Sequence, residues 1–415
     1  MSILIKKNIL IKIQKLFLFL IPFFLFARFF ADLFLVIICI IFIFQSYNYK
    51  LYKYYNNYYF KFFLVFWFYL TLRSIFTEDI NSIISSLGYI RFAIFSLAVW
   101  YLLDIDIKLF HNFFKILFIT FIVYIIDGYI QSIYGVNIFL IKNIDPMRVT
   151  SFFGKEQILG SYLSRLSPLL IGLFFLIKKK NFRNLFIYTP FLMFLSFLIV
   201  LSGERTAIFF NIFFFFIIIF FIKPFSFSKI LIFFLCFIFF LVLSNLPIYK
   251  ENIKNRIYYQ TTQNLIKNDR LHYATDVHEA HIKTAYKIFT DNPLFGVGNK
   301  MFRKVCLEPQ YFIYKGCTNH PHNVFFQILS ELGLVGALFY IIVFLYLIKN
   351  FIQNFFDSKI KIFIQNYKTC LLFCFIISLF PLAPSGNFFN NWLSIIFYLP
   401  VGFYLHYFYK KNKKC

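Results

Sequence analysis

Charged side chains are scarce in this sequence: only 14% of its 415 residues are Asp, Glu, Lys or Arg. Hydrophobic residues make up 60% of the chain and aromatic residues 24%. A soluble domain of this composition could not cover itself with polar groups, so soluble folds are excluded. The apolar residues also occur in runs of about 17 to 22, the length that crosses a hydrocarbon core roughly 30 Å thick. The sequence therefore predicts an all-α, polytopic membrane protein.

Acidic residues are the scarcer charge, with 17 Asp and Glu against 42 Lys and Arg, so the net charge is +25. In a soluble chain such an excess would suggest a nucleic-acid partner. Here the lysines lie in short segments between the apolar runs, where they set the orientation of a membrane protein. We therefore expect a lipid bilayer, and no nucleic acid, around this chain.

Twelve apolar segments are predicted to cross the membrane, namely residues 14–28, 30–46, 60–75, 84–103, 109–130, 157–177, 185–202, 206–222, 229–247, 323–348, 363–384 and 388–407. Lysine-rich connections alternate with connections that carry little positive charge, and short cytoplasmic loops are rich in Lys and Arg. This alternation predicts that both termini are cytoplasmic. The first segment follows a basic start like that of a signal peptide, but a second apolar run follows directly, so we expect it to be retained.

The largest polar piece of the chain is predicted to lie outside the membrane. Residues 1–247 hold the first nine spans, residues 248–322 form one large periplasmic loop, and residues 323–415 hold the last three spans and a basic cytoplasmic tail. Long loops cross a membrane despite positive charge, so the lysines of this loop agree with the topology. The sequence has no evident internal repeat and no matching pair of broken helices, which many transporters have.

Histidine is scarce, with seven residues in the chain. On this topology five lie on the outer side, namely His272, His278, His281, His320 and His322. The last two, in "CTNHPHN", directly precede the tenth span and lack neighbouring Cys or carboxylate ligands at zinc spacing. One interpretation is an ordinary helix entrance, with Asn319 or Asn323 as the cap and Pro321 fixing the approach. The other is a functional site, because a helix N-terminus attracts phosphate and favours the neutral imidazole of a base.

Cysteine is equally scarce, and two of the seven residues, Cys306 and Cys317, lie in the large loop. In an oxidising periplasm they are expected to form a disulfide that closes a short loop. Such a bridge would bring Arg303 towards His320 and His322. The alternative is a pair of free thiols. The other five cysteines fall in predicted spans or in the tail, where we expect them to fill apolar space.

Few arginines lie in or near the predicted spans. Arg205, in "SGERT", lies at the membrane rim. It is either a snorkelling anchor with Glu204 as its counter-ion or a group that binds phosphate oxygens. Arg165 falls inside a span, needs an aqueous cavity or a partner such as Glu156, and is a candidate for lining the groove of a lipid carrier. Arg91 also falls inside a predicted span, and the sequence gives fewer reasons to assign it a function.

Residues 292–298, "NPLFGVG", form a turn-rich strip whose glycines permit positive φ, but the spacing matches neither a dinucleotide fingerprint nor a P-loop. Together with "HNVFFQILSELGLVG" at residues 322–336, this strip resembles the O-antigen ligase and O-antigen polymerase (Wzy-type) superfamily of membrane glycosyltransferases. The ligase pattern is a histidine, then Asn, Ser or Gln, nine residues, Gly, two residues and Gly, Thr or Tyr. Here it is satisfied by His322, Asn323, Gly333 and Gly336. The similarity covers residues 85–345, although the sharp motif lies at the end of the loop.

The resemblance implies a metal-independent, inverting glycosyltransferase of the membrane-embedded C type (GT-C), for which we expect no cofactor. Such enzymes move a glycan from undecaprenyl diphosphate to an acceptor hydroxyl at the periplasmic face of the bacterial inner membrane. A ligase, our first hypothesis, uses a lipid A–core sugar as the acceptor in lipopolysaccharide biosynthesis. A polymerase, the alternative, joins carrier-linked repeat units of a polysaccharide. A transporter or flippase is a third hypothesis, which the scarcity of charges deep in the helices disfavours.

The resemblance also implies roles for individual residues. His322 corresponds to the histidine that takes the acceptor proton, and its free pKa near 6.5 suits that role. Arg205 corresponds to an arginine that binds the diphosphate and stabilises the leaving group. A second family arginine usually lies about fifteen residues before Pro293, where this chain has His278. The candidates for this second diphosphate contact are therefore Arg270, Arg303 and His278. The residues expected to support these side chains are His320, Asn323 and Arg165.

Overall fold

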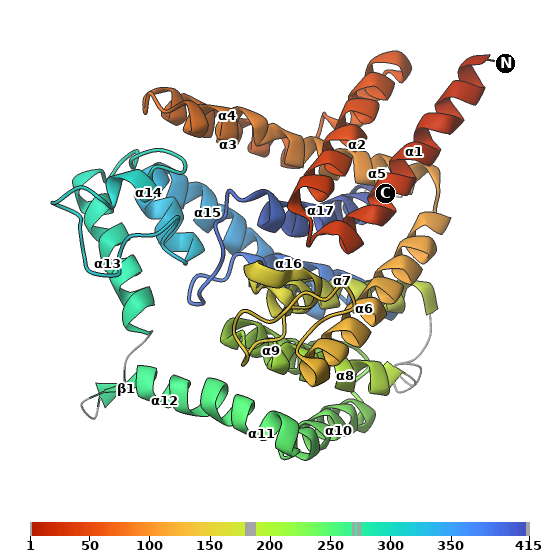
Figure 1. Cartoon of the computed structure of the whole chain (residues 1–415). Coiled ribbons are helices and arrows are strands. Elements are labelled where there is room, and N and C mark those ends of the chain that lie inside the picture. The colour runs from red at the N-terminus through yellow and green to blue at the C-terminus, as the bar shows by residue number, and fades with distance from the viewer. Residues whose placement is uncertain (1, 179–187, 268–269, 272–274, 412–415) are drawn as a thin grey trace. The chain divides into compact units, whose positions relative to one another are not determined.

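The computed structural model describes residues 2–178, 188–267, 270–271 and 275–411, and this part of the chain is almost entirely helical (Figure 1). Its only strands are β1 (Ile266–Lys267) and β2 (Arg270–Leu271), which pair antiparallel. The chain forms two compact units, each built from segments that are distant in the sequence. Unit 1 comprises Met1–Leu109, Tyr273–Ile348 and Ser378–Cys415, and unit 2 comprises Phe110–His272 and Lys349–Ile377.

Unit 1 contains the N-terminal helices, the glycine and histidine motifs and the C-terminal helix. Its helices are α1 (Ser2–Phe24), α2 (Arg28–Tyr49), α3 (Tyr58–Ile75), α4 (Ile80–Gly88), α5 (Ile90–Ile105), α13 (Asp276–Asp291), α14 (Phe302–Val305), most of α15 (Val324–Phe356) and α17 (Asn391–Lys411). Almost every side chain of α5 between Phe92 and Leu103 is buried, so α5 forms the core of this unit. Gly402 of α17 lies so close to α5 that a β-carbon there would be 2.5 Å from Cβ of Val99. This small residue lets the two helices pack closely, as helices in membranes commonly do.

Unit 2 contains the central helices and the loops between them. Its helices are most of α6 (Lys108–Tyr134), α7 (Leu159–Lys178), α8 (Thr189–Leu201), α9 (Arg205–Phe221), α10 (Phe227–Ser244), α11 (Pro247–Ile253), α12 (Gln260–Leu265), the end of α15 and α16 (Ile362–Ser378). Buried polar side chains of α6 fix the loop that follows it. Asp127 accepts hydrogen bonds from the hydroxyl of Ser151 (2.5 Å) and the amide of Ile138 (2.9 Å), and Gln131 accepts one from the amide of Ser151 (2.6 Å).

Most residues of the predicted spans lie in helices, with differences in detail. Residues 379–384 follow the end of α16, and residues 185–187 of the span at 185–202 lie outside the described part of the chain. Residues 84–103 lie on two helices, α4 and α5, rather than one. Residues 323–348 lie on α15, which continues to Phe356 and is interrupted at Gly333. In the described part of the chain, six helical segments are long and apolar enough to cross a membrane: Arg28–Tyr49, Ile80–Ile105, Lys108–Tyr134, Leu159–Ile177, Phe227–Ser244 and Val324–Phe356. The protein is a multi-pass membrane protein.

Candidate functional site

The two glycine motifs of the sequence pack against each other within unit 1. The helix α15 is broken at Gly333, where φ is 63°. The strip at residues 292–298 fills this break and forms backbone hydrogen bonds with the exposed groups of the helix. The amide of Gly298 donates to the carbonyl of Glu331 (2.7 Å), and the amide of Leu334 donates to the carbonyl of Pro293 (2.8 Å). The unpaired groups of the broken helix are thus satisfied by the strip.

Helix α3 supplies two side chains that complete this junction. The hydroxyl of Tyr69 donates to the carbonyl of Leu332 (2.6 Å). Arg73 donates through Nη2 to the carbonyl of Gly296 (2.7 Å). Sequence reasoning assigned no role to either residue, because the contacts join segments more than two hundred residues apart. The junction thus ties α3 and the glycine strip to α15 at its break.

His322 lies immediately before α15, in the left-handed backbone region with φ of 52°. Its carbonyl accepts a hydrogen bond from the amide of Ser385 (2.8 Å). The next residue, Asn323, caps the helix, since its Oδ1 accepts from the amide of Phe326 (3.1 Å) and its Nδ2 donates to the carbonyl of Pro381 (2.7 Å). The helix-entrance interpretation therefore describes Asn323, whose side chain makes the hydrogen bonds of the cap.

Three further histidines surround the ring of His322. The ring centroid of His320 lies 4.1 Å from that of His322, that of His281 lies at 5.1 Å and that of His278 at 5.8 Å. His281 is buried and contacts the carbonyl of Gly316 through Nδ1 (3.1 Å). His320 contacts the carbonyl of Ser385 through Nε2 (3.3 Å). The sequence singled out three of these four residues, and the structure adds His281 to the cluster.

The surroundings of His322 and His320 favour the neutral forms of these two imidazoles. Burial first, and then the charges of His320, His281 and His278, lower the pKa of His322 to about 3. Burial likewise lowers the pKa of His320 to about 4. Within residues 2–178, 188–267, 270–271 and 275–411, no group of three or more His, Cys, Asp or Glu is arranged to hold a metal ion. At neutral pH the ring of His322 is thus a neutral imidazole that can accept a proton.

Cys306 and Cys317 form a disulfide, with their Cα atoms 5.3 Å apart. Cys306 of this bridge packs in a small buried core with Ala285 and Ile288 of α13 and with Phe302 and Tyr311. It ties α14, which carries Arg303, to the segment that carries His320. Arg303 is near enough to His320 for its positive charge to contribute to the lowered pKa of that imidazole.

Unit 2 contains a separate cluster of arginines at the start of α9. Arg205 is the first residue of this helix, and the charges of Arg148 and Arg256 act on it. Its Nη2 makes a long hydrogen bond to the carbonyl of Arg256 (3.5 Å), while its Nε is buried and has no hydrogen-bond partner among the described residues. Glu204, the expected counter-ion, accepts instead from the amide of Gly160 (2.7 Å) at the start of α7. The cluster therefore has unused capacity to bind an anion.

The neighbours of Arg205 have different tasks. The guanidinium of Arg148 is hydrogen-bonded within the protein, because it donates to the carbonyl of Ser202 (3.1 Å) and to Oε1 of Gln157 (2.7 Å). Arg256 donates to Oε1 of Gln260 (2.7 Å). No sequence motif marks Arg148 or Arg256.

Two further predicted site residues are Arg165 and Arg270. Arg165 is buried in α7 with its guanidinium 5.2 Å from the ring centroid of Phe210. Its Nε and Nη1 have no hydrogen-bond partner among the described residues, and the carboxylate whose charge acts on it is Glu204. Arg270 belongs to β2, but its side chain lies outside the described part of the structure. The predicted diphosphate contacts thus divide between the units, with Arg303 and His278 in unit 1.

Comparison with known protein families gives one match. Residues 190–341 match the family model described as O-antigen ligase. This match covers less than half of the chain, and we refer to the matched residues as the O-antigen ligase segment. The match confirms the resemblance to the O-antigen ligase and polymerase superfamily that the motifs indicated. A comparison with curated proteins finds no match.

The O-antigen ligase segment contains most of the features described above. It begins in α8 and ends in α15, so it includes Arg205, the glycine strip, the disulfide and His322. The tail of α15, the loop at Ser385 and helices α3 to α5 lie outside it. Ser385 and Arg73 therefore reach the motifs of the O-antigen ligase segment from flanking parts of the chain.

Proposed function

We propose that the protein is an O-antigen ligase-type membrane glycosyltransferase. It moves a glycan from undecaprenyl diphosphate to a hydroxyl of a lipid A–core sugar at the periplasmic face of the bacterial inner membrane. The observation that carries this proposal is the neutral imidazole of His322, held at the entrance of α15 by the packed glycine motifs of the O-antigen ligase segment. A neutral imidazole beside an acceptor hydroxyl is what general-base catalysis requires.

His322 is the proposed base. The acceptor oxygen attacks the anomeric carbon, the bond from that carbon to the diphosphate oxygen breaks, and the hydroxyl proton passes to the imidazole. A pKa of about 3 is low for a base. The anionic diphosphate of a bound donor would raise it towards neutrality, because a nearby negative charge favours the imidazolium. The histidine would thus become an effective base only when the donor is bound.

Arg205 is the proposed electrostatic group for the leaving diphosphate. Its guanidinium is permanently charged, and its two-pronged geometry fits phosphate oxygens. The capacity left by its unpartnered Nε and the positive charges of Arg148 and Arg256 support this role. Fixed cations that stabilise the negative charge developing on a leaving group typically lower the activation barrier by several kcal/mol.

A polymerase of the same superfamily is the second candidate. It would use the same base and the same donor but a carrier-linked repeat unit as acceptor, and the family match covers both possibilities. A deletion strain of the source bacterium distinguishes them. A ligase defect leaves lipid A–core without polymer while carrier-linked polymer accumulates, whereas a polymerase defect leaves single repeat units on the core. Unchanged envelope glycans, or lost export with intact joining, would contradict both.

Complementation of that strain tests the role of His322. We expect His322→Ala to restore no glycan joining. His111→Ala is the matched control, because His111 is an exposed histidine near the start of α6. We expect this variant to restore joining fully. Full activity of His322→Ala, at normal abundance in the membrane, would refute the proposed mechanism.

A further inference from the structure

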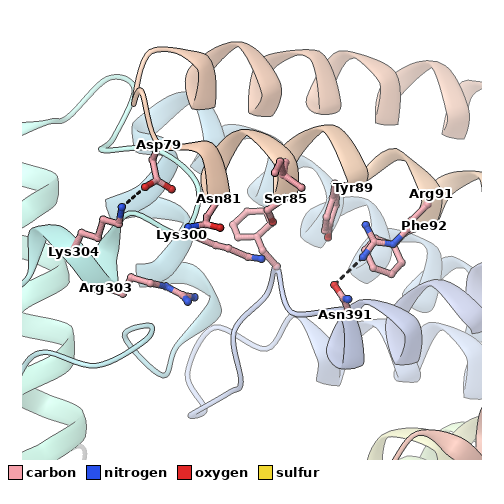
Figure 2. A pocket seen from close by; sticks show the side chains of 12 residues that line it. Asp79, Asn81, Ser85, Tyr89, Arg91, Phe92, Lys300, Arg303, Lys304 and Asn391 are labelled. Carbon is pink, nitrogen blue, oxygen red and sulfur yellow. Dashed lines mark hydrogen bonds and ion pairs between the residues drawn. The ribbon is translucent and has the colours of Figure 1, made fainter. Parts of the chain in front are cut away.

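Unit 1 encloses a cavity of about 530 Å³ that the motifs did not reveal (Figure 2). Its walls come from the starts of α4, α5 and α17 and from the segment around α14. Figure 2 shows the side chains of Lys300 and Arg303 extending towards this space from one side, opposite Tyr89 and Arg91. A cavity of this volume is large enough for one or two sugar rings.

Two of the four cations around the cavity are already neutralised or fully hydrogen-bonded. Lys304 forms an ion pair with Asp79. Arg91 donates to Asp32 (3.1 Å), to the carbonyl of Gly88 (2.6 Å) and to Asn391 (2.8 Å). Neither group therefore needs a ligand.

Lys300 and Arg303 are different. In the described part of the chain, Nε of Arg303 is buried without a hydrogen-bond partner. Burial lowers the pKa of Lys300, and the positive charges of Arg303 and Arg91 lower it further. A buried donor without a partner and two cations held close together both favour a bound anion. The carboxylate whose negative charge acts on Lys300 is Glu331. It is buried and accepts a hydrogen bond from Nε2 of Gln327 (3.1 Å).

The rest of the lining suits a sugar. Tyr89, Phe92 and Phe389 provide aromatic rings, with the centroid of Tyr89 5.2 Å from that of Phe92 and 5.6 Å from that of Phe389. Asn81 and Ser85 of α4 add groups that can hydrogen-bond hydroxyls. Apolar rings beside a few polar groups and two cations match the mixed surface of an acidic sugar.

The cavity adjoins the histidine cluster. Arg303 lines it and also acts electrostatically on His320. The loop that follows α16 contributes to both places, because Ser385 binds the backbone of His322 and the ring of His320 while Phe389 lines the cavity. A ligand held there would lie near the proposed base.

We propose that this cavity binds a phosphate or carboxylate group of the acceptor glycan through Lys300 and Arg303. The inference rests on the proposed function, and it specifies the acceptor as an acidic glycan. The diphosphate of the donor offers the same anionic chemistry. The acceptor is favoured because the cavity combines aromatic and hydroxyl-binding groups with the two cations, whereas a diphosphate needs the cations alone.

Binding of simple sugars to the full-length protein in nanodiscs tests the inference without catalysis. The probes are galacturonic acid and glucose 6-phosphate, their neutral counterparts galactose and glucose, and inorganic pyrophosphate for the donor group. We expect the acidic sugars to bind about tenfold more tightly than the neutral ones. Lys300→Gln and Arg303→Gln should remove this preference, and Lys300→Arg should keep it. The matched control is Lys315→Gln, which removes one exposed lysine of unit 1 away from the cavity.

Each outcome decides a different point. Equal binding of acidic and neutral sugars by the parent protein, or an unchanged preference in correctly folded Lys300→Gln and Arg303→Gln, overturns the inference. If Lys300→Gln and Arg303→Gln lose pyrophosphate binding but keep acidic-sugar binding, the cavity belongs to the donor, and the inference is also overturned. His322→Ala should keep the preference while losing transfer. If it instead keeps transfer, the proposed function fails and the binding result is unaffected.

Discussion

Gly333 lies so close to Gly296 that a β-carbon at Gly333 would be 2.6 Å from the backbone nitrogen of Gly296. Both residues have positive φ, 63° and 65°. Neither position therefore has room for a side chain, and neither backbone suits one. A β-carbon at Gly296 would in turn collide with the backbone of Glu331 and Leu332. Each motif therefore requires a glycine in the other, which explains why the two occur together.

Replacing either glycine by alanine should destabilise unit 1. The left-handed backbone alone costs an L-residue about 1–2 kcal/mol, and the collision with backbone atoms adds to this. We expect Gly333→Ala and Gly296→Ala to lower the unfolding temperature of the detergent-solubilised protein by several degrees. Gly386→Ala is the matched control, since a β-carbon there would meet nothing within 4 Å. Equal unfolding temperatures for all three variants would contradict the packing described above.

Much of the fold was predictable because it depends on local composition. Long apolar runs form helices in a membrane, since each backbone group must be paired within its own segment. The interruption of α15 was not predictable in this way. The strip that fills the break lies dozens of residues earlier, and apolar periodicity near Gly333 does not change. Similarly, Tyr89 is where α4 gives way to α5 although the apolar run continues.

The candidate site was predictable only where a motif marks it. The pattern of His322, Asn323, Gly333 and Gly336 pointed to the junction before α15. No pattern pointed to Arg256 or to Ser385, because their hydrogen bonds with Arg205 and His322 are made through a backbone carbonyl and a backbone amide, which nearly every residue possesses. Glu204 was the counter-ion of Arg205 in one of the two interpretations of that arginine, whereas in the structure it accepts a hydrogen bond at the start of α7. Sequence spacing cannot reveal which of several nearby groups a carboxylate will bind.

The disulfide is expected to stabilise the segment between α14 and α15. Closing a loop of this size contributes about 3 kcal/mol in loop-entropy models. We expect a reducing agent to lower the unfolding temperature of the parent protein but to leave that of a Cys306→Ser, Cys317→Ser double variant unchanged. Mass spectrometry after alkylation without reductant checks the bond directly. Alkylation of both residues in the unreduced parent protein would show that the bond is absent.

Acid should weaken unit 1 through its histidine cluster. The pKa of His322 falls from the ordinary 6.5 to about 3 in the folded protein, so below pH 6.5 the unfolded chain binds a proton that the folded chain does not. Stability is therefore complete above pH 6.5 and is lost as the pH falls towards 3. We expect the unfolding temperature to decline over this range and the decline to be shallower in His322→Gln. If the unfolding temperature of His322→Gln declines with falling pH as steeply as that of the parent protein, another group is responsible for the decline.

Substitutions of Arg205 test the diphosphate contact, because glutamine removes the positive charge whereas lysine keeps the charge and removes only the planar guanidinium. Arg205→Gln removes the charge, and we expect kcat/KM for glycan transfer to fall by about 10²- to 10³-fold, as for other electrostatic groups at a leaving oxygen. Arg205→Lys keeps the charge without the planar fork, so it should recover part of this loss. Lys250→Gln is the control, since it removes one exposed charge from α11 in the same unit. If Arg205→Gln loses no more activity than Lys250→Gln, Arg205 is a membrane anchor rather than a substrate contact.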